Sequence, residues 1–486
     1  MADNLKQKTV NGVLWNSIGN FSVRGIQFLL MLIMARLLSP GDYGTIGLIT
    51  VFLSVSQIFI DSGFGNALIR NAKATNEDLS TVFVFNIFIS LATYSIVWFI
   101  APFVSDFYHM PILTPVMRVL GLQLIIGALG AIQGIVYTKN LNFKIKARIS
   151  VVGTLLSGIC GVTFAFYGFG VWALVWQTLI HGSLTTIMNW FFSTWKPSIL
   201  FSKTSFKSMF NYGSNLLVTN LLGCIYDNIY PLVIGKFYSP SVLGHSSRAQ
   251  HWAQFPSSNI TNILRSVTFP VLAKIVDDEP RLISAYRRIL KCSAFIIFPL
   301  MLCLSAVSKP LIVITIGVKW GLCATLLQIV CFKMMWYPIH AINLNLLMVK
   351  GRSDLYLRLE IIKKILGVSI LILTLPYGII VMTYGGVVSS ILCLFINTFY
   401  TGKLIHMGFL KQMKDLTPTL FLSLIMFGFV SLVVHLTTNI YIQLIFGTIV
   451  GFVIYLGGSH LFKFEELKEV VVIFKEFKNK KNNSIQ

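Results

Sequence analysis

The feature that most constrains this chain is a series of apolar runs, each about twenty residues long, separated by short polar segments. An α-helix of that length crosses the ~30 Å hydrocarbon core of a bilayer. Only 12% of the residues are charged, against about 25% in soluble domains. Backbone at membrane depth must satisfy its own hydrogen bonds, so we expect an all-α integral membrane protein. The fourteen predicted transmembrane spans are 10–36, 41–63, 80–102, 114–138, 147–167, 170–193, 208–236, 241–272, 290–308, 320–349, 358–376, 379–402, 418–436 and 440–461.

The positive charge follows the spans. A net charge of +22 can indicate nucleic-acid binding, but the basic residues here lie in short clusters between apolar runs. If the N-terminus is inside, thirty of the 39 Lys and Arg lie in or beside inner segments and only four in outer ones. Lys and Arg accumulate on the cytoplasmic side. We therefore expect both termini in the cytoplasm, contacts with membrane lipids and no nucleic-acid partner.

No motif indicates a metal, a cofactor or a nucleotide. The seven cysteines fall inside apolar runs, none forms a CxxC pair, and no Cys/His cluster has metal-ligand spacing. The phosphate-binding pattern GxxxxGK[ST] does not occur. We expect no cofactor, and ATP is not predicted to be the direct energy source.

One short phrase occurs twice, as RLLSPGDYG (Arg36 to Gly44) and KFYSPSVLG (Lys236 to Gly244). Ser-Pro is a helix-start signature, with Ser as the N-cap and Pro at the first helical position. Each phrase is therefore predicted to be a tight outer turn, joining spans 1 and 2 or spans 7 and 8. Residues 11–50 and 211–250 share six identities in forty, a count that chance alone also explains.

The spacing strengthens the repeat. Six spans separate the copies. The basic inner loops at Tyr137–Ser150 and Met348–Lys364 also occupy corresponding places in the order of spans. An even number of spans gives parallel repeats, related by an axis along the membrane normal. We expect two six-helix bundles around a cavity, at 1–200 and 201–410. Two additional helices at 411–462 and a basic cytoplasmic tail at 463–486 follow.

Four stretches carry a family resemblance: ARLLSPGDYGTIGLI (Ala35 to Ile49), IDSGFGNALIR (Ile60 to Arg70), YGFGVWALVWQTL (Tyr167 to Leu179) and SRAQHWAQFPSSNITNILRSVTFPVLAKI (Ser247 to Ile275). They resemble the multidrug/oligosaccharidyl-lipid/polysaccharide flippase superfamily, in its bacterial polysaccharide-transporter (Wzx-type) branch. The resemblance covers about residues 8–410.

The resemblance implies a flippase of the bacterial inner membrane. Such a protein moves an undecaprenyl-diphosphate-linked oligosaccharide from the cytoplasmic to the periplasmic leaflet by alternating access around a cationic cavity. The glycan would be a repeat unit of lipopolysaccharide O-antigen, capsule or exopolysaccharide. Polysaccharide polymerase machinery is an implied partner, and we expect a monomer.

Charged residues inside the spans are the candidate site residues, because each costs about 2.5–3.5 kcal/mol to insert at the membrane centre. Arg suits a phosphate through its planar fork and Lys acts as a point charge. The alternative for each is pairing with a neighbouring helix or reaching the membrane surface. The predicted substrate-binding cations are Arg24, Arg248, Lys333, Arg265 and Arg118.

Arg24 is the strongest of these candidates, since it lies midway along the first span. Asn20 and Gln27 share roughly its helix face, where they are predicted to contact sugar, as are His251 and Trp252 on the eighth span. Arg118, Asp61 and Arg265 lie nearer span ends.

Asp227 lies close to the position in the second repeat that Arg24 holds in the first. Asp227 and Asp61 are predicted gate or ion-coupling residues, and a helix-packing ion pair is equally open for Asp227.

Two other functions compete with the flippase. A cation-coupled multidrug exporter of the same fold would need an acidic cavity, whereas the residues within the spans are mainly basic. A polysaccharide polymerase or ligase would need a substantial outer loop, and the outer loops are short and nearly uncharged. We therefore expect a transporter and not an enzyme.

Overall fold

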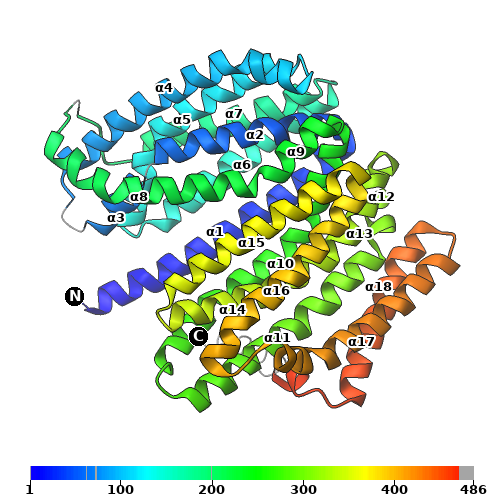
Figure 1. Cartoon of the computed structure of the whole chain (residues 1–486). Coiled ribbons are helices and arrows are strands. Elements are labelled where there is room, and N and C mark those ends of the chain that lie inside the picture. The colour runs from blue at the N-terminus through cyan, green and yellow to red at the C-terminus, as the bar shows by residue number, and fades with distance from the viewer. Residues whose placement is uncertain (1, 62, 72–73, 199, 470–486) are drawn as a thin grey trace. The chain divides into compact units, whose positions relative to one another are not determined.

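The computed structural model describes residues 2–61, 63–71, 74–198 and 200–469, and Figure 1 shows its helices. Within these ranges the regular elements are all helical, without a strand, which confirms the predicted all-α fold. The chain forms two compact units, Met1–Gly244 and His245–Gln486. The predicted division at residues 1–200, 201–410 and 411–462 stays a prediction.

The first unit holds nine helices among its described residues, together with the first turn of a tenth. They are α1 (Ala2–Leu37), α2 (Pro40–Asp61), α3 (Phe64–Arg70), α4 (Asn76–Tyr108), α5 (Leu113–Lys139), α6 (Phe143–Phe166), α7 (Val171–Phe192), α8 (Lys203–Asp227), α9 (Ile229–Phe237) and the start of α10 (Pro240–Lys274).

The second unit holds the rest of α10 and the helices that follow it. They are α11 (Glu279–Ala306), α12 (Ser308–Ile316), the 3₁₀ turn η1 (Val318–Trp320), α13 (Gly321–Met334), α14 (Tyr337–Val349), α15 (Ser353–Thr374), η2 (Leu375–Tyr377), α16 (Ile379–Ile405), α17 (Phe409–Leu436) and α18 (Ile440–Leu461).

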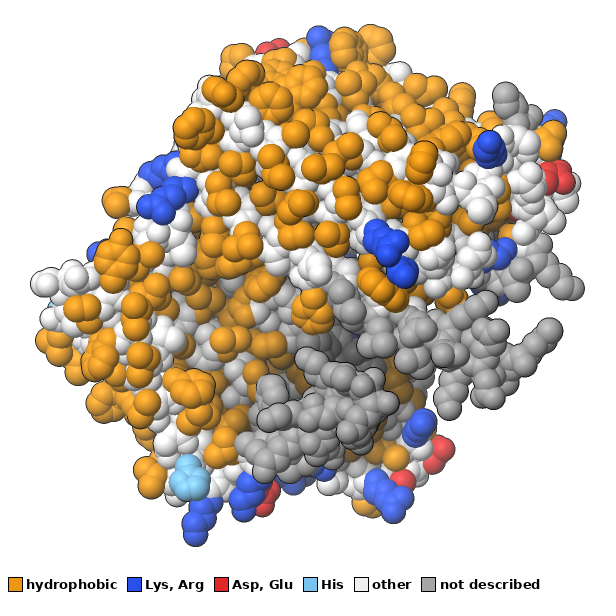
Figure 2. All heavy atoms as spheres, turned by 180° about the vertical axis from the view of Figure 1, so that it is seen from behind, with side chains coloured by type: hydrophobic (Ala, Val, Ile, Leu, Met, Phe, Trp, Pro, Cys, Tyr) orange, Lys and Arg blue, Asp and Glu red, His pale blue; other side chains and the backbone are white. Residues whose placement is uncertain are grey.

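Eleven of the described helical segments are long and apolar enough to cross a membrane. Three further predicted spans form helices that are not among these eleven, namely α7, α10 and α15. The chain is thus a multi-pass membrane protein, and the count of fourteen spans and the two-bundle layout stay predictions. Large apolar side chains are widely exposed, for example Phe103 at 73% and Phe452 at 66%. Figure 2 shows such side chains covering much of one face, as lipid contact requires.

Two predicted spans are interrupted, and a proline explains each break. In the span predicted at 208–236, α8 ends at Asp227 and α9 begins at Ile229. Pro231 has no N–H, so it cannot bond the carbonyl oxygen of Asp227 four residues before it. In the span predicted at 320–349, α13 ends at Met334, and Pro338 stands four residues further on.

The span predicted at 290–308 also differs, because α11 begins at Glu279, eleven residues earlier. Asp278 caps this helix, accepting a hydrogen bond from the backbone N–H of Arg281 at 3.2 Å. The polar segment around Asp278 therefore starts a helix.

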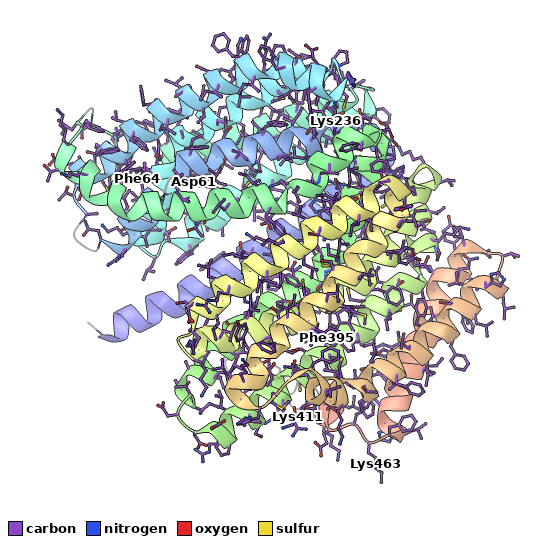
Figure 3. The ribbon with its side chains drawn as sticks, in the orientation of Figure 1. Asp61, Phe64, Lys236, Phe395, Lys411 and Lys463 are labelled. Atoms are coloured by element: carbon purple, nitrogen blue, oxygen red, sulfur yellow. The ribbon has the colours of Figure 1, made fainter. Side chains whose placement is uncertain are left out.

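Helices of the first unit approach closely at small residues. A Cβ atom on Gly182 of α7 would lie 2.2 Å from the Gln123 Oε1 atom of α5, and one on Gly130 of α5 would lie 2.8 Å from Thr186 Oγ1 of α7. Small residues allow this approach in membranes, where helix association depends on close packing. At the end of α9, Lys236 donates to the carbonyl oxygen of Phe107 at 2.5 Å and lies 3.9 Å from its ring (Figure 3).

The first copy of the repeated phrase forms the predicted helix start. Ser39 and Asp42 make reciprocal bonds at the start of α2: Asp42 N–H donates to Ser39 Oγ at 3.2 Å, and Ser39 N–H donates to Asp42 Oδ2 at 2.9 Å. Ser39 is thus the N-cap and Pro40 the first helical residue, as predicted. In the second copy, Val242 N–H donates to Ser239 Oγ at 3.4 Å. No carboxylate returns the bond there, because the residue at that position is Val242.

The two turns lie against each other within the first unit. A Cβ on Gly44 would lie 1.8 Å from the carbonyl oxygen of Pro240, and a Cβ on Gly244 would lie 1.8 Å from that of Pro40. The contact is reciprocal, and both neighbours are backbone atoms that cannot rotate away. Glycine at both positions is therefore required by this contact, which the sequence comparison did not reveal.

We predict that Gly44→Ala or Gly244→Ala lowers the midpoint of thermal unfolding in detergent. The cost should be about 1–3 kcal/mol, because the added methyl group forces the turns apart. Gly41→Ala is the matched control, since its Cβ would meet only Ser39 Oγ at 3.7 Å. Equal midpoints for Gly44→Ala and Gly41→Ala would contradict the close contact.

Candidate functional site

Helix α1 leaves a polar face uncovered in the first unit. One side of the helix packs on α6, where a Cβ on Gly19 would lie 2.5 Å from the Ala147 Cβ. Arg24, Asn20 and Gln27, by contrast, are exposed. Among the residues that the structure describes, Arg24 makes no hydrogen bond or ion pair. We call Asn20, Arg24 and Gln27 the α1 polar face.

Asp227 lies where α8 and α9 meet. It is the last residue of α8 and is exposed. The Nδ2 atom of the neighbouring Asn228 donates to the carbonyl oxygen of Cys224 at 2.8 Å, and the Asn228 backbone N–H donates to the same oxygen at 3.1 Å. Interrupted helices in transporters commonly line binding sites. The break therefore places an acidic side chain at an irregular point of a predicted span.

Two other predicted site residues of the first unit contact neighbouring residues. The Arg118 Nε donates to the carbonyl oxygen of Trp98 on α4 at 3.3 Å, and its guanidinium lies 4.4 Å from the Trp98 ring centroid. Asp61 ends α2 and accepts a hydrogen bond from Gln57 Nε2 at 3.0 Å. Gly63, with φ of 74°, then turns the chain into α3, whose Phe64 enters the core (Figure 3). The structure brings neither Arg118 nor Asp61 onto the α1 polar face.

Helix α10 also has a polar face, which lies in the second unit. His251, Gln254, Asn262 and Arg265 are exposed along it at three- to eight-residue intervals. We call these four residues the α10 polar face. The abundance of polar residues explains why α10 is not among the eleven apolar spans.

The opposite side of α10 is packed, and it includes a predicted sugar contact. Trp252 is only 7% exposed, so little of its ring is free to stack on a sugar. Arg248 is half-buried and lies one turn before His251. Sequence reasoning could not tell the packed side of α10 from the open one, because both sides carry polar residues.

Polar groups of α10 and α16 contact the break between α13 and α14 inside the second unit. Ser257 of α10 donates to the carbonyl oxygen of Met334 at 2.8 Å, the oxygen that Pro338 leaves without an N–H partner. Ser390 of α16 lies 3.4 Å from the carbonyl oxygen of Lys333. The Lys333 side chain passes Gly386 on α16, 3.6 Å from the position of an added Cβ.

Sequence reasoning selected Lys333 but missed the residues around it. His340 Nε2 lies 3.1 Å from Ser390 Oγ, and its Nδ1 lies 3.0 Å from Asn397 Nδ2. The signal available was Pro338 in the middle of an apolar run, which predicts freed carbonyl groups and therefore side-chain partners for them.

The structure thus assembles the predicted residues only in part. The α1 polar face gathers Asn20, Arg24 and Gln27, and the α10 polar face gathers His251 and Arg265. Arg118, Asp61, Asp227 and Lys333 each lie in separate surroundings. A single cavity lined by all of them stays a prediction. Within the described ranges, no group of three or more His, Cys, Asp or Glu could hold a metal ion.

We predict that Ser257→Ala lowers the thermal unfolding midpoint, because it leaves the buried Met334 carbonyl oxygen without its partner. The expected cost is about 1–3 kcal/mol. Ser258→Ala is the control, since Ser258 bonds only the carbonyl oxygen of Gln254 in its own helix, at 2.7 Å. Unfolding of wild type and Ser257→Ala at the same temperature would show that the serine does not repair the break.

Comparison with known proteins identifies the family of this chain. Residues 33–325 match the family model described as polysaccharide biosynthesis protein. The chain is 23% identical over 371 residues to the lipopolysaccharide biosynthesis protein WzxC of Escherichia coli K12, covering 76% of this chain and 75% of WzxC. It is 24% identical over 395 residues to the probable low-salt glycan biosynthesis flippase Agl15 of Haloferax volcanii, covering 78% and 80%.

A solved structure shares the fold. The lipid II flippase MurJ in an inward closed conformation superposes with a TM-score of 0.75 at 18% identity, covering 93% of this chain and 98% of MurJ. At that identity the likeness concerns the arrangement of helices. The family model, by contrast, spans more than half of the sequence, and the chain therefore belongs to the polysaccharide biosynthesis protein family.

Proposed function

We propose that this protein is a flippase for a lipid-linked oligosaccharide. Its substrate is an undecaprenyl-diphosphate-linked repeat unit of O-antigen, capsule or exopolysaccharide, moved from the cytoplasmic to the periplasmic leaflet by alternating access. Family membership supports polysaccharide biosynthesis, and the names of WzxC and Agl15 refer to lipopolysaccharide and glycan biosynthesis. The observation that carries the proposal is the exposed, unpaired Arg24 on the α1 polar face.

The depth of Arg24 makes it informative. Arg24 lies thirteen residues before Leu37, the last residue of α1, or about 20 Å at 1.5 Å per residue. An arginine side chain does not reach the membrane surface beyond Leu37 over that distance, and the predicted start of the span at residue 10 lies fourteen residues away on the other side. A guanidinium at this depth needs an anionic partner, and a diphosphate supplies one through two parallel N–H···O bonds.

The other residues of the two polar faces fit a sugar. Asn20 and Gln27 carry amides that both donate and accept hydrogen bonds, as sugar hydroxyl groups do. Arg265 and His251 give the α10 polar face further groups for an anionic, hydroxyl-rich substrate. We keep Asp227 and Asp61 as proposed gate or ion-coupling residues, and Lys333, Arg248 and Arg118 as proposed cations of the pathway.

We also propose an orientation, an oligomeric state and a partner for this protein. Both termini are proposed to be cytoplasmic, the protein is proposed to act as a monomer, and polysaccharide polymerase machinery is its proposed partner. The fold is compatible with a drug exporter as well. The basic polar faces, however, repel cationic drugs and attract a diphosphate, so they favour the lipid-linked glycan.

We predict that Arg24→Ala abolishes most surface glycan in cells whose only flippase is this protein. The loss should be at least about 100-fold, because a guanidinium–phosphate pair buried from water contributes on the order of 3 kcal/mol. Arg24→Lys should retain intermediate activity, since it keeps the charge but loses the bidentate fork. Surface glycan can be measured by gel electrophoresis and blotting.

Arg148→Ala is the control, because Arg148 is an exposed arginine of α6 outside both polar faces. Membrane content of each variant must match wild type. Normal surface glycan in Arg24→Ala cells would exclude Arg24 from substrate binding.

A further inference from the structure

We infer that the second unit carries a separate binding site for the phosphate headgroup of an anionic phospholipid. The site is a cavity of about 370 Å³ between the start of α11 and the turn that joins α16 to α17. Its polar lining comes from Arg287, His406, Lys411, Lys414 and Asp415. These residues belong to neither polar face, and the site is independent of the proposed transport reaction.

The charges of this cavity do not balance. Asp415 is held by Arg287 in a two-pronged pair, with distances of 2.7 Å from Nε and 2.6 Å from Nη2. The carboxylate is therefore already neutralised. The exposed side chains of His406, Lys411 and Lys414 have no hydrogen bond or ion pair with any described residue. At least two positive charges thus remain for an anionic ligand.

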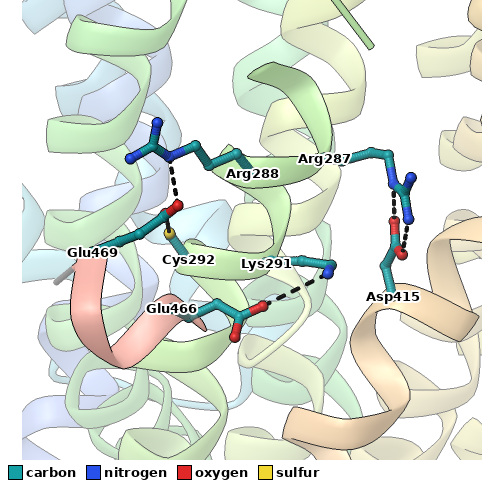
Figure 4. A network of polar contacts seen from close by, with 7 residues as sticks. All are labelled: Arg287, Arg288, Lys291, Cys292, Asp415, Glu466 and Glu469. Carbon is teal, nitrogen blue, oxygen red and sulfur yellow. Dashed lines mark hydrogen bonds and ion pairs between the residues drawn. The ribbon is translucent and has the colours of Figure 1, made fainter. Parts of the chain in front are cut away.

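A neighbouring cavity on α11 provides the contrast. It measures about 580 Å³ and is lined by Arg288, Lys291, Glu466 and Glu469, among others. There, Arg288 Nε lies 2.8 Å from Glu469 Oε1, and Lys291 Nζ lies 3.8 Å from Glu466 Oε1. Figure 4 shows these pairs beside that of Arg287 with Asp415. Because Arg288 and Lys291 are each paired with a glutamate of that cavity, an anion gains more in the smaller cavity.

A buried hydrogen-bond network holds the α16–α17 turn and the start of α17, which carry the basic residues, in place. Gln412, which is fully buried, donates from Nε2 to the carbonyl oxygen of Met407 at 2.8 Å and to Asn343 Oδ1 at 3.0 Å. Tyr286 of α11 donates to the same Asn343 oxygen at 3.0 Å. This network holds the start of α17 against α11 and α14. Lys411 and Lys414, one turn apart, are therefore presented from a rigid support (Figure 3 labels Lys411).

The surroundings favour a lipid over a soluble anion. Leu410, next to Lys411, is 81% exposed, and Phe421 further along α17 is 65% exposed. A ligand in the cavity would thus have basic groups at its phosphate and apolar side chains along its tail. The α16–α17 turn is also predicted to lie on the cytoplasmic side, where basic clusters attract anionic lipid headgroups.

The test is lipid retention by the purified full-length protein, measured by native mass spectrometry. The protein is taken from nanodiscs that contain equal parts of phosphatidylglycerol and phosphatidylcholine. We expect wild type to retain phosphatidylglycerol preferentially. In the variant Lys411→Gln/Lys414→Gln, the ratio of retained phosphatidylglycerol to phosphatidylcholine should fall about tenfold. Lys403→Gln/Lys463→Gln, which removes two exposed lysines outside the cavity, should keep it.

Three results would overturn the inference. The cavity variant could retain the wild-type preference, or the control variant could lose as much of it. The third result comes from a parallel arm with undecaprenyl phosphate added. If wild type retains undecaprenyl phosphate over phosphatidylglycerol and the cavity variant does not retain it, the cavity is a substrate site. Unchanged elution and unfolding midpoints of both variants exclude misfolding, which is not expected because all four lysines are exposed.

Discussion

The hydrogen bond from Ser257 to the carbonyl oxygen of Met334 illustrates the constraint on which the structure depends. In hydrocarbon, each polar group needs a partner within the protein. Pro338 removes the partner of that oxygen, and a serine from another helix replaces it at 2.8 Å. Arg24 is exposed and has no hydrogen-bond or ion-pair partner among the described residues, and we propose it as the group that binds the ligand.

The repeated Ser-Pro phrase has a physical role as well as a sequence similarity. Each copy starts a helix, and the two copies meet through Gly44 and Gly244 at backbone distance. The halves of the chain have diverged beneath these turns. Arg24 lies on the continuous helix α1, whereas Asp227 lies where α8 ends. The helices before the two turns thus contain groups of opposite charge, which we propose to serve an anionic substrate and a gate or coupled ion.

Sequence reasoning predicted what depends on local chemistry. The helical class followed from the apolar runs, and the N-cap at Ser39 and helix start at Pro40 followed from capping rules; the structure confirms them. The packing partners of each helix could not be predicted from the sequence. The burial of Trp252 and the stacking of Arg118 on Trp98 depend on which face of a helix meets a neighbour. The two helix breaks were readable from Pro231 and Pro338, but α4, α11 and α17 contain Pro102, Pro299 and Pro418 without ending.

Translocation in proteoliposomes is the most direct test of the flippase. The purified protein would be reconstituted with an undecaprenyl-diphosphate-linked oligosaccharide in one leaflet, and exposure of the glycan in the other would be followed with a membrane-impermeant glycan-modifying enzyme. The account predicts that modification beyond the initially exposed leaflet requires the wild-type protein and falls to the protein-free level with Arg24→Ala. Glycan exposure that is the same with and without the wild-type protein would contradict it.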